Sequence, residues 1–275
     1  MGIIDDIKRE AGERDVIIQD ERSRELQSEF NKMFYLDKCP DKELEFFKMV
    51  MTRGQDTAER KGLHASAVIV SEENFCLRQQ VLSLFYRQLQ GGQTPIGLKR
   101  IFSQGDAIHE KWQRMFIRAG YVNPLDCDYT LFDEEYCLTF TPDLNNVKIK
   151  GITYIGEIKS VNTVQFKRMV ENQLHHESGH KQLMLYMHLT GIEKGFVLCE
   201  DKNDQKIKVD VYDYDYSEIE EVIKRLELIT EARERLIDYG KVPQRHYKCS
   251  HIKADKACSC PMRDVCFGKS KEFII

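Results

Sequence analysis

The stretch TPDLNNVKIKGITYIGEIKSV at residues 141–161 decides the fold. Apolar and polar residues alternate through most of it, as they do in β-strands that bury one face. The pair Asn145-Asn146 has the composition of a tight turn, so we expect it to separate two strands. Alternation begins near Asp128, and residues 128–161 are therefore predicted to form a β-meander.

Two carboxylates and a lysine occupy defined positions in this meander. Asp143 ends the first run, and Glu157 lies on the returning strand. Antiparallel pairing can bring two such side chains together. Lys159 follows Glu157 by two residues, so the period of a strand places both on the same face. This set suits phosphodiester hydrolysis with a divalent metal, because Mg²⁺ and Mn²⁺ prefer oxygen ligands.

Two helices are predicted ahead of the meander from the spacing of their apolar residues. The first covers residues 71–90 and carries Cys76, and the second covers residues 98–120 and carries His109. Residues 78–118 hold seven basic and two acidic residues, a local charge of +5. We therefore expect a basic surface around the histidine.

A helix, two strands and a long helix are predicted after the meander. The first helix begins near Val164, bends around Ser178-Gly179 and ends at Gly191. Alternation returns within residues 195–215, and the long helix that follows is expected to begin with Ser217 as its N-cap. The order of elements therefore predicts an α/β protein.

The composition describes a chain that folds around a sizeable core. Its 275 residues are 41% hydrophobic and 31% charged, with a formal net charge of −4, which excludes disordered, collagen-like and low-complexity chains. No apolar run is long enough to cross a membrane, and the N-terminus lacks the pattern of a secretory signal. We expect a cytoplasmic protein. Nine cysteines, an odd number without an export signal, argue against a disulfide framework.

Six residues form an ordered series, each on the type of element expected for it: His109, Asp143, Glu157, Lys159, Gln182 and Tyr186. The series resembles the RecB-like branch of the PD-(D/E)XK nucleases, which carry a histidine ahead of the aspartate and a Q-x-x-x-Y helix after the E-x-K strand. An aspartate followed by E-x-K is common by chance, and an exposed strand pair is the alternative for that motif alone. The whole series favours the resemblance, which covers about residues 64–268.

The resemblance implies a PD-(D/E)XK (restriction-endonuclease-like) core, in which a central mixed β-sheet is flanked by helices. The ligands that it implies for Mg²⁺ or Mn²⁺ are His109, Asp143, Glu157 and the main-chain carbonyl of Ile158. Lys159 would assist catalysis, and Gln182 and Tyr186 would contact DNA and brace the site.

The function implied by the resemblance is that of a hydrolase, a metal-dependent DNA exonuclease. It would act on single strands or duplex ends in recombination, repair, phage DNA metabolism or CRISPR adaptation, in a bacterial, archaeal or phage-infected cell. The enzymatic alternative is a structure-specific or sequence-specific endonuclease with the same site. A non-catalytic, metal-stabilised nucleic-acid-binding assembly subunit is the other alternative, and the intact catalytic series argues against it.

Local charge must attract DNA, because the net charge is negative. Besides residues 78–118, the tail at residues 241–275 holds eight basic and three acidic residues, again +5. Residues 200–238 hold seven basic and thirteen acidic residues, −6, and should face away from DNA.

The resemblance divides the chain into an N-terminal helical elaboration at residues 1–60 and a RecB-like nuclease domain at residues 61–275. The first 60 residues carry apolar residues at helical intervals and no chemical motif. They are expected to cover the core, and docking of a protein partner or of a second copy of the chain is the alternative.

The cysteine-rich region at about residues 245–268 holds Cys249, Cys258, Cys260 and Cys266. Thiolates are the ligands of soft metals and iron-sulfur clusters. Several RecB-like nucleases close their C-terminal end with a [4Fe-4S] cluster that uses one cysteine ahead of the nuclease motifs and three in the tail. Cys76 and the tail cysteines reproduce that arrangement.

The tail departs from the family spacing C-x2-C-x5-C at one position. That spacing needs a cysteine where this chain has Ala257. The third tail ligand is then Cys249 or Cys258. We favour Cys249, because a gap of one residue between Cys258 and Cys260 restricts how both thiolates can turn toward one cluster.

Zinc is the competing occupant of the tail. A structural tetrahedral site is satisfied by Cys249, His251, Cys260 and Cys266. Buried free thiols account well for the scattered cysteines, which are Cys39, Cys127, Cys137 and Cys199.

A group of three histidines precedes Gln182 in the sequence. His175, His176 and His180 lie close together, but Glu177 is the one nearby residue whose spacing suits a shared metal ion. We expect these histidines to contact a phosphate or solvent instead.

Overall fold

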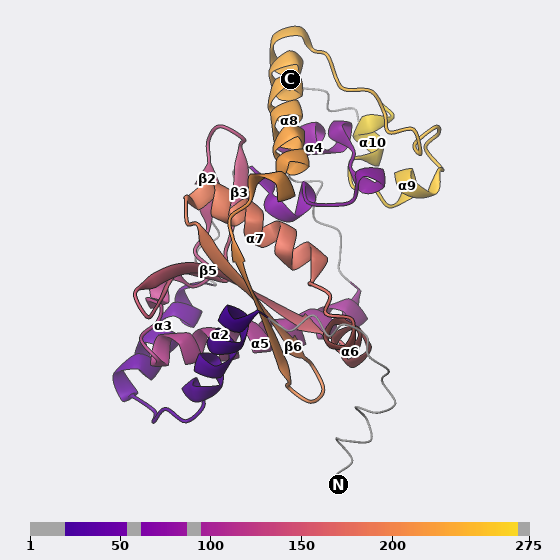
Figure 1. The fold of residues 1–275 in the computed structure, drawn as a ribbon. Helices are drawn as coiled ribbons and strands as arrows, with labels where there is room; N and C mark the ends of the chain where they lie inside the picture. Colours follow the sequence, from indigo (N-terminus) through magenta and orange to yellow (C-terminus); the bar gives the residue numbers. More distant parts are fainter. Residues whose placement is uncertain (1–19, 54–61, 87–94, 269–275) are drawn as a thin grey trace.

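The computed structural model describes residues 20–53, 62–86 and 95–268 of the chain. Its centre is a four-stranded sheet with the strand order β4-β5-β6-β7 (Figure 1). The strands are β4 (Leu144–Ile149), β5 (Ile152–Val161), β6 (Lys194–Asp201) and β7 (Ile207–Asp213). Strands β5 and β6 are parallel, and the other two pairs are antiparallel. The expected mixed sheet is thereby confirmed.

Helices cover both faces of this sheet, as expected. The parallel pair β5 and β6 requires a crossover, which is supplied by α6 (Thr163–Glu171) and α7 (Glu177–Thr190). Helix α7 packs on the face that carries Ile155 of β5. The opposite face carries Ile158 and is covered by α2 (Glu21–Met33) and α5 (Ile96–Arg118), as Figure 1 shows.

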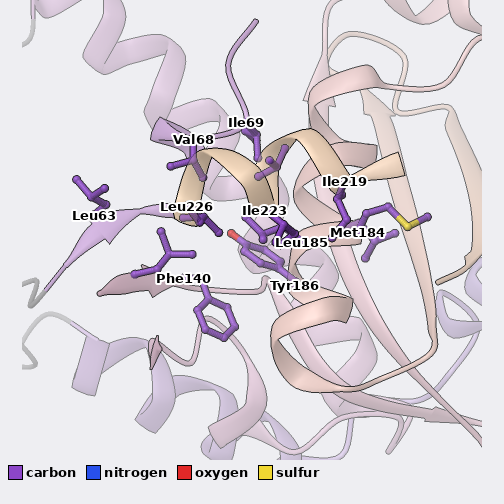
Figure 2. Close-up of a cluster of buried hydrophobic side chains, with 14 of the residues drawn as sticks. Leu63, Val68, Ile69, Phe140, Met184, Leu185, Tyr186, Ile219, Ile223 and Leu226 are labelled. Atoms are coloured by element: carbon purple, nitrogen blue, oxygen red, sulfur yellow. The ribbon is translucent and has the colours of Figure 1, made fainter. Parts of the chain in front are cut away.

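The core on the α7 side also includes α8 (Glu220–Tyr239). Figure 2 shows Tyr186 of α7 within this cluster, together with Ile223 and Leu226 of α8. The Tyr186 ring lies 5.6 Å from the ring of Phe140, measured between centroids. The helix that carries the Q-x-x-x-Y pair is therefore held between the sheet and α8.

The remaining elements surround this centre. They are α3 (Pro40–Arg53), α4 (Leu77–Phe85), α9 (Asp255–Cys258), α10 (Arg263–Cys266), β1 (Leu63–His64), β2 (Leu131–Asp133) and β3 (Leu138–Phe140). The three short strands form a separate sheet in the order β1-β3-β2. Figure 1 shows α4, α8, α9 and α10 grouped at one end of the molecule.

The prediction of a single meander with a turn at Asn145-Asn146 is wrong. Strands β2 and β3 belong to the small sheet, and both asparagines lie within β4, where the register shifts. The turn is Lys150-Gly151, whose φ angles of 50° and 80° suit a two-residue hairpin loop. Asn146 also has a positive φ, 51°, and this residue makes an irregularity in the strand instead of a turn.

Three predicted helix boundaries also differ from the structure. The chain leaves its helical path at residues 172–176, between α6 and α7, and Ser178-Gly179 lie in the first turn of α7. Ser217 lies in a 3-10 turn capped by Asp215, and α8 begins at Glu220. Cys76 precedes α4 as its N-cap. The end of the helix predicted over residues 71–90 falls at residues 87–90, outside the described ranges.

The N-terminal helices pack on the sheet. Leu26, Phe30 and Met33 of α2 are buried in one cluster with Phe116 of α5 and Phe196 of β6. Helix α2 therefore covers the core, as expected of it, although the division of the chain at residue 60 stays a prediction. No helix in the described part of the chain has the length and apolar composition needed to cross a membrane.

Candidate active site

Asp143 is held in place by hydrogen bonds on every side. Its main-chain carbonyl accepts from the buried Gln113 side chain at 3.1 Å and from the Asp128 N–H at 3.2 Å. Carboxylate Oδ2 accepts from the Ile158 N–H at 2.7 Å, and Oδ1 lies 3.1 Å from Nδ1 of His109. The residue precedes β4 directly, so the hairpin fixes it beside β5.

Glu157 lies on β5 with its side chain almost wholly buried, at 1% exposure. Its oxygen Oε1 pairs with Nζ of Lys159 at 2.5 Å. The other oxygen, Oε2, is buried and has no hydrogen-bond partner among the described residues. A buried carboxylate oxygen without a partner is costly, so this atom points to a missing positive ligand or donor.

A chain of hydrogen bonds continues from Lys159 to α7. Nζ of Lys159 donates to Oε1 of Gln182 at 3.0 Å, and Nε2 of Gln182 donates to the hydroxyl of Tyr186 at 2.6 Å. Tyr186 is fully buried. Of the two roles expected for this tyrosine, bracing the site is the one that a buried side chain can fill. The six residues of the predicted series therefore lie in one connected site.

The pKa values of His109 and Asp143 are shifted in opposite directions. Burial lowers the pKa of His109, but the charge of Asp143, the hydrogen bond to it and the charge of Glu157 outweigh burial and raise the pKa to about 9. Burial raises the pKa of Asp143, and the His109 and Lys159 charges and the Ile158 N–H outweigh it, so that this pKa is lowered. Asp143 and His109 therefore form an ion pair.

Glu157 behaves differently from Asp143. Burial and the charge of Asp143 raise its pKa to about 7, against the lowering effect of Lys159. Burial lowers the pKa of Lys159, but Glu157 and Asp143 outweigh it and raise that pKa. Two carboxylates whose pKa values are driven apart are typical of sites that perform acid-base chemistry.

The donor set fits a divalent cation, although its members are paired with each other. Within residues 20–53, 62–86 and 95–268, no three His, Cys, Asp or Glu side chains are arranged to hold a metal ion. His109 and Ile158 engage the Asp143 carboxylate, and Lys159 engages one oxygen of Glu157. Two carboxylates, one of which carries the unpartnered Oε2, are nonetheless the oxygen ligands that Mg²⁺ and Mn²⁺ prefer.

Sequence reasoning missed two residues that shape the site. Gln113 lies four residues after His109 on α5, so their shared helix face was a signal for it. Gly179 gave no signal. A Cβ atom there would lie 3.2 Å from both Cγ and Cε of Lys159, so the absence of a side chain leaves room for the lysine.

Four cysteines line one pocket at the other end of the molecule, namely Cys76, Cys249, Cys260 and Cys266. Burial and the charges of neighbouring thiolates raise the pKa of Cys249. Cys258 is exposed and does not line the pocket, and neither does His251. The histidine that does line it is His246, which the predicted zinc site did not include.

Comparisons with known proteins show similarity to solved structures. No family profile and no curated protein matches this chain. An alkaline exonuclease, LHK-Exo from Laribacter hongkongensis, is similar with a TM-score of 0.48 and 17% identity over 68% of this chain and 95% of that chain. The complex of LHK-Exo with dAMP is similar with a TM-score of 0.47 and 20% identity over 68% of this chain and 96% of that chain.

The protein SSO0001 gives a TM-score of 0.44 and 13% identity over 83% of this chain and 96% of that chain. At these identities, and with TM-scores below 0.5, the similarities carry no conclusion about the activity of this chain.

Proposed function

We propose that this chain is a metal-dependent DNA nuclease that hydrolyses phosphodiester bonds, acting as an exonuclease on single strands or duplex ends. One observation carries the proposal. Glu157 is buried beside Asp143 with one oxygen paired to Lys159 and the other without a partner. A buried ion pair with a purely structural role normally has a hydrogen-bond partner for every one of its buried polar atoms. The unsatisfied oxygen is therefore better explained by a bound cation.

The roles are those that the family resemblance implies, and the contacts of the side chains support them. The residues that would hold Mg²⁺ or Mn²⁺ are His109, Asp143, Glu157 and, through its carbonyl, Ile158. When bound, the cation would polarise a phosphate oxygen and lower the pKa of a water molecule. Lys159 would stabilise charge that develops on the phosphate. Gln182, itself held by Tyr186, keeps the Lys159 ammonium in place.

The proposal extends to the cysteine pocket. Cys76, Cys249, Cys260 and Cys266 would hold a [4Fe-4S] cluster, with structural Zn²⁺ as the alternative. The lining of one pocket by these four thiols supports this choice, and so does the position of Cys258 outside it. The cluster would close the C-terminal end of a nuclease domain at residues 61–275. DNA is the proposed partner, in the cytoplasm.

The test is cleavage by variants that remove one carboxylate at a time. We expect Glu157→Gln and Asp143→Asn to lose Mn²⁺-dependent cleavage by roughly 10³-fold, the scale seen when a group that stabilises charge at a catalytic centre is removed. Asp204→Asn is the matched control, because this exposed carboxylate lies in the β6–β7 turn. Full activity of either active-site variant would reject the proposed nuclease.

The substrate separates the exonuclease from its alternatives. Linear single-stranded and duplex DNA should be degraded from their ends, and closed circular DNA should stay intact. Cutting of circles would favour an endonuclease with the same site. Binding without cleavage of any substrate would favour the non-catalytic assembly subunit.

A further inference from the structure

A cavity of about 380 Å³ lies beside the start of α7. Its polar lining comes from three parts of the chain: Ser71, Gln165 of α6, and His176, Ser178 and Lys181 at the start of α7. A Cβ atom on Gly179 would lie 3.1 Å from Nδ1 of His176 and 3.2 Å from Cε of Lys159. The histidine of the cavity and the lysine of the active site therefore pack against the same glycine.

The hydrogen bonds of His176 fix which of its nitrogens carries the proton. Nδ1 accepts from the Gly179 N–H at 3.1 Å, and this bond caps α7. A ring nitrogen that accepts is unprotonated, so the proton of the neutral ring is on Nε2. Burial and the charge of Lys159 lower the pKa of His176, which keeps the ring neutral near pH 7. Nε2 is therefore a hydrogen-bond donor in a half-buried side chain.

The rest of the lining suits an anion attached to an apolar group. Its single carboxylate, Glu177, is already paired with Lys181 at 2.9 Å. The hydroxyls of Ser71 and Ser178 and the Gln165 amide are further donors. Ile69 and Val70 supply an apolar wall. A phosphate joined to a sugar or a base has the matching chemistry.

We propose that this cavity binds a phosphate of the substrate strand next to the one that is cleaved, and that Nε2 of His176 donates a hydrogen bond to it. This subsite rests on the proposed nuclease function and deepens it. His176 is then a positioning residue: it holds the strand so that the scissile phosphate lies at Lys159. The shared glycine couples the two positions.

The experiment uses His176→Asn in the full-length protein that also carries Glu157→Gln, so that DNA stays intact. Asparagine is among the best N-caps and can keep the bond to the Gly179 N–H, but it is too short to place a donor where Nε2 lies. We expect the Kd for a single-stranded thymidine oligonucleotide to rise at least about tenfold, the loss of one hydrogen bond to a charged group. His175→Asn is the control, because His175 bonds to Tyr212 and does not line the cavity.

Neutral methylphosphonate linkages, placed one at a time along the oligonucleotide, identify the phosphate. In the protein that carries Glu157→Gln alone, neutralising one particular linkage should weaken binding about tenfold. When His176→Asn is also present, neutralising that same linkage should have no further effect. If removal of a 5′-phosphate reproduces this pattern, the bound group is the terminal phosphate of the strand. Equal losses in both proteins at every linkage would overturn the subsite.

The two proposals fail separately. If the unaltered protein cuts no DNA but the linkage dependence is present, the nuclease proposal is rejected, and the cavity is a phosphate site of a DNA-binding protein. If DNA is cut and no linkage depends on His176, the subsite is rejected and the nuclease stands.

Discussion

Two carboxylates of one hairpin lie in different electrostatic surroundings. Asp143 has a cationic partner in His109 and a hydrogen bond from the Ile158 N–H, and its pKa is lowered. Glu157 is buried next to the charge of Asp143, and its pKa is raised to about 7. A bound cation would remove this difference, because it would favour the ionised form of both carboxylates.

These pKa values predict how the stability of the metal-free protein depends on pH. Glu157 has a pKa of about 7 against an ordinary 4.5, so its protonated form stabilises the folded state and this stability is lost as the pH rises through 7. His109 has a pKa of about 9 against 6.5, so its contribution is full below 6.5 and is lost as the pH rises through 9. The free energy of unfolding should therefore fall from pH 5 to pH 9, by at most about 1.4 kcal/mol per pH unit for each group.

Urea unfolding with a chelator present, at intervals from pH 5 to pH 9, measures this slope. Glu157→Gln should remove most of the fall in the free energy of unfolding below pH 7 and should keep most of the fall above pH 7. A profile that is the same in the variant and the parent would contradict the assignment of the lower half to Glu157.

The sequence predicted which side chains lie together in the site better than it predicted the boundaries of the elements. The resemblance to RecB-like nucleases selected His109, Asp143, Glu157 and Lys159, and the structure brings these side chains together, while their roles stay a prediction. The pairing of Gln113 with the Asp143 carbonyl was not foreseen, because the helix face that it shares with His109 places the glutamine near the site but does not identify its partner.

At the scale of elements, α7 approaches the sheet closely through two glycines. A Cβ atom on Gly195 of β6 would lie 2.8 Å from Cδ1 of Leu183, and one on Gly179 would lie 3.2 Å from Lys159. The first glycine lets α7 pack on the sheet, and the second leaves space for Lys159. Substitution of each should therefore have a different effect.

Gly179→Ala should reduce kcat by about tenfold or more without loss of stability. Alanine favours a helix over glycine by up to about 1 kcal/mol, which offsets the tight contact, but Lys159 must move away from its position beside Glu157. Steady-state kinetics and thermal unfolding of the same preparations measure both effects.

Gly97→Ala is the control for Gly179→Ala. Both glycines lie in the first turns of helices, and a Cβ atom on Gly97 meets no atom within 4 Å. The control should keep its activity. Unchanged kcat in Gly179→Ala would show that the glycine does not set the position of the lysine.

The sequence predicted the order of elements better than their boundaries. Alternation and helical spacing were sufficient for the strands and helices of the central sheet. The small sheet could not be predicted, because β3 pairs with β1, whose two residues Leu63–His64 lie far away in the sequence. The hairpin turn was misplaced, because two asparagines and Lys150-Gly151 both have the composition of a turn and only strand pairing selects between them.

At the scale of the whole molecule, the tail is held to α4 by a small set of contacts. Arg78 donates to the carbonyls of Pro243 at 2.7 Å and Cys266 at 3.2 Å. Lys256 donates to the carbonyl of Glu73 at 2.9 Å. The buried apolar cluster at this junction consists of Leu82, Tyr86, Met262 and Val265. Because this apolar cluster is small, it stabilises the junction between the tail and α4 only weakly. A metal ligated by the thiolates would stabilise the junction further.

The cysteine variants test this arrangement. Cys249→Ser should lose the bound metal, and Cys258→Ser should keep it, because Cys249 lines the pocket with Cys76, Cys260 and Cys266 whereas Cys258 lies outside. Anaerobic purification followed by iron, sulfide and zinc analysis measures the loss. Iron matched by sulfide, with a broad absorption band at roughly 400 nm, would identify an iron-sulfur cluster, and zinc alone would identify the tetrahedral alternative.

Limited proteolysis of the same variants shows what the metal does for the molecule. In Cys249→Ser, cleavage should concentrate in residues 241–268, because the tail then depends on the few contacts with α4. The central sheet has its own cores on both faces and should stay resistant. Loss of metal from Cys258→Ser with retention in Cys249→Ser would reverse the ligand assignment. Equal protection of the tail in both variants would show that the α4 contacts are sufficient to hold it without metal.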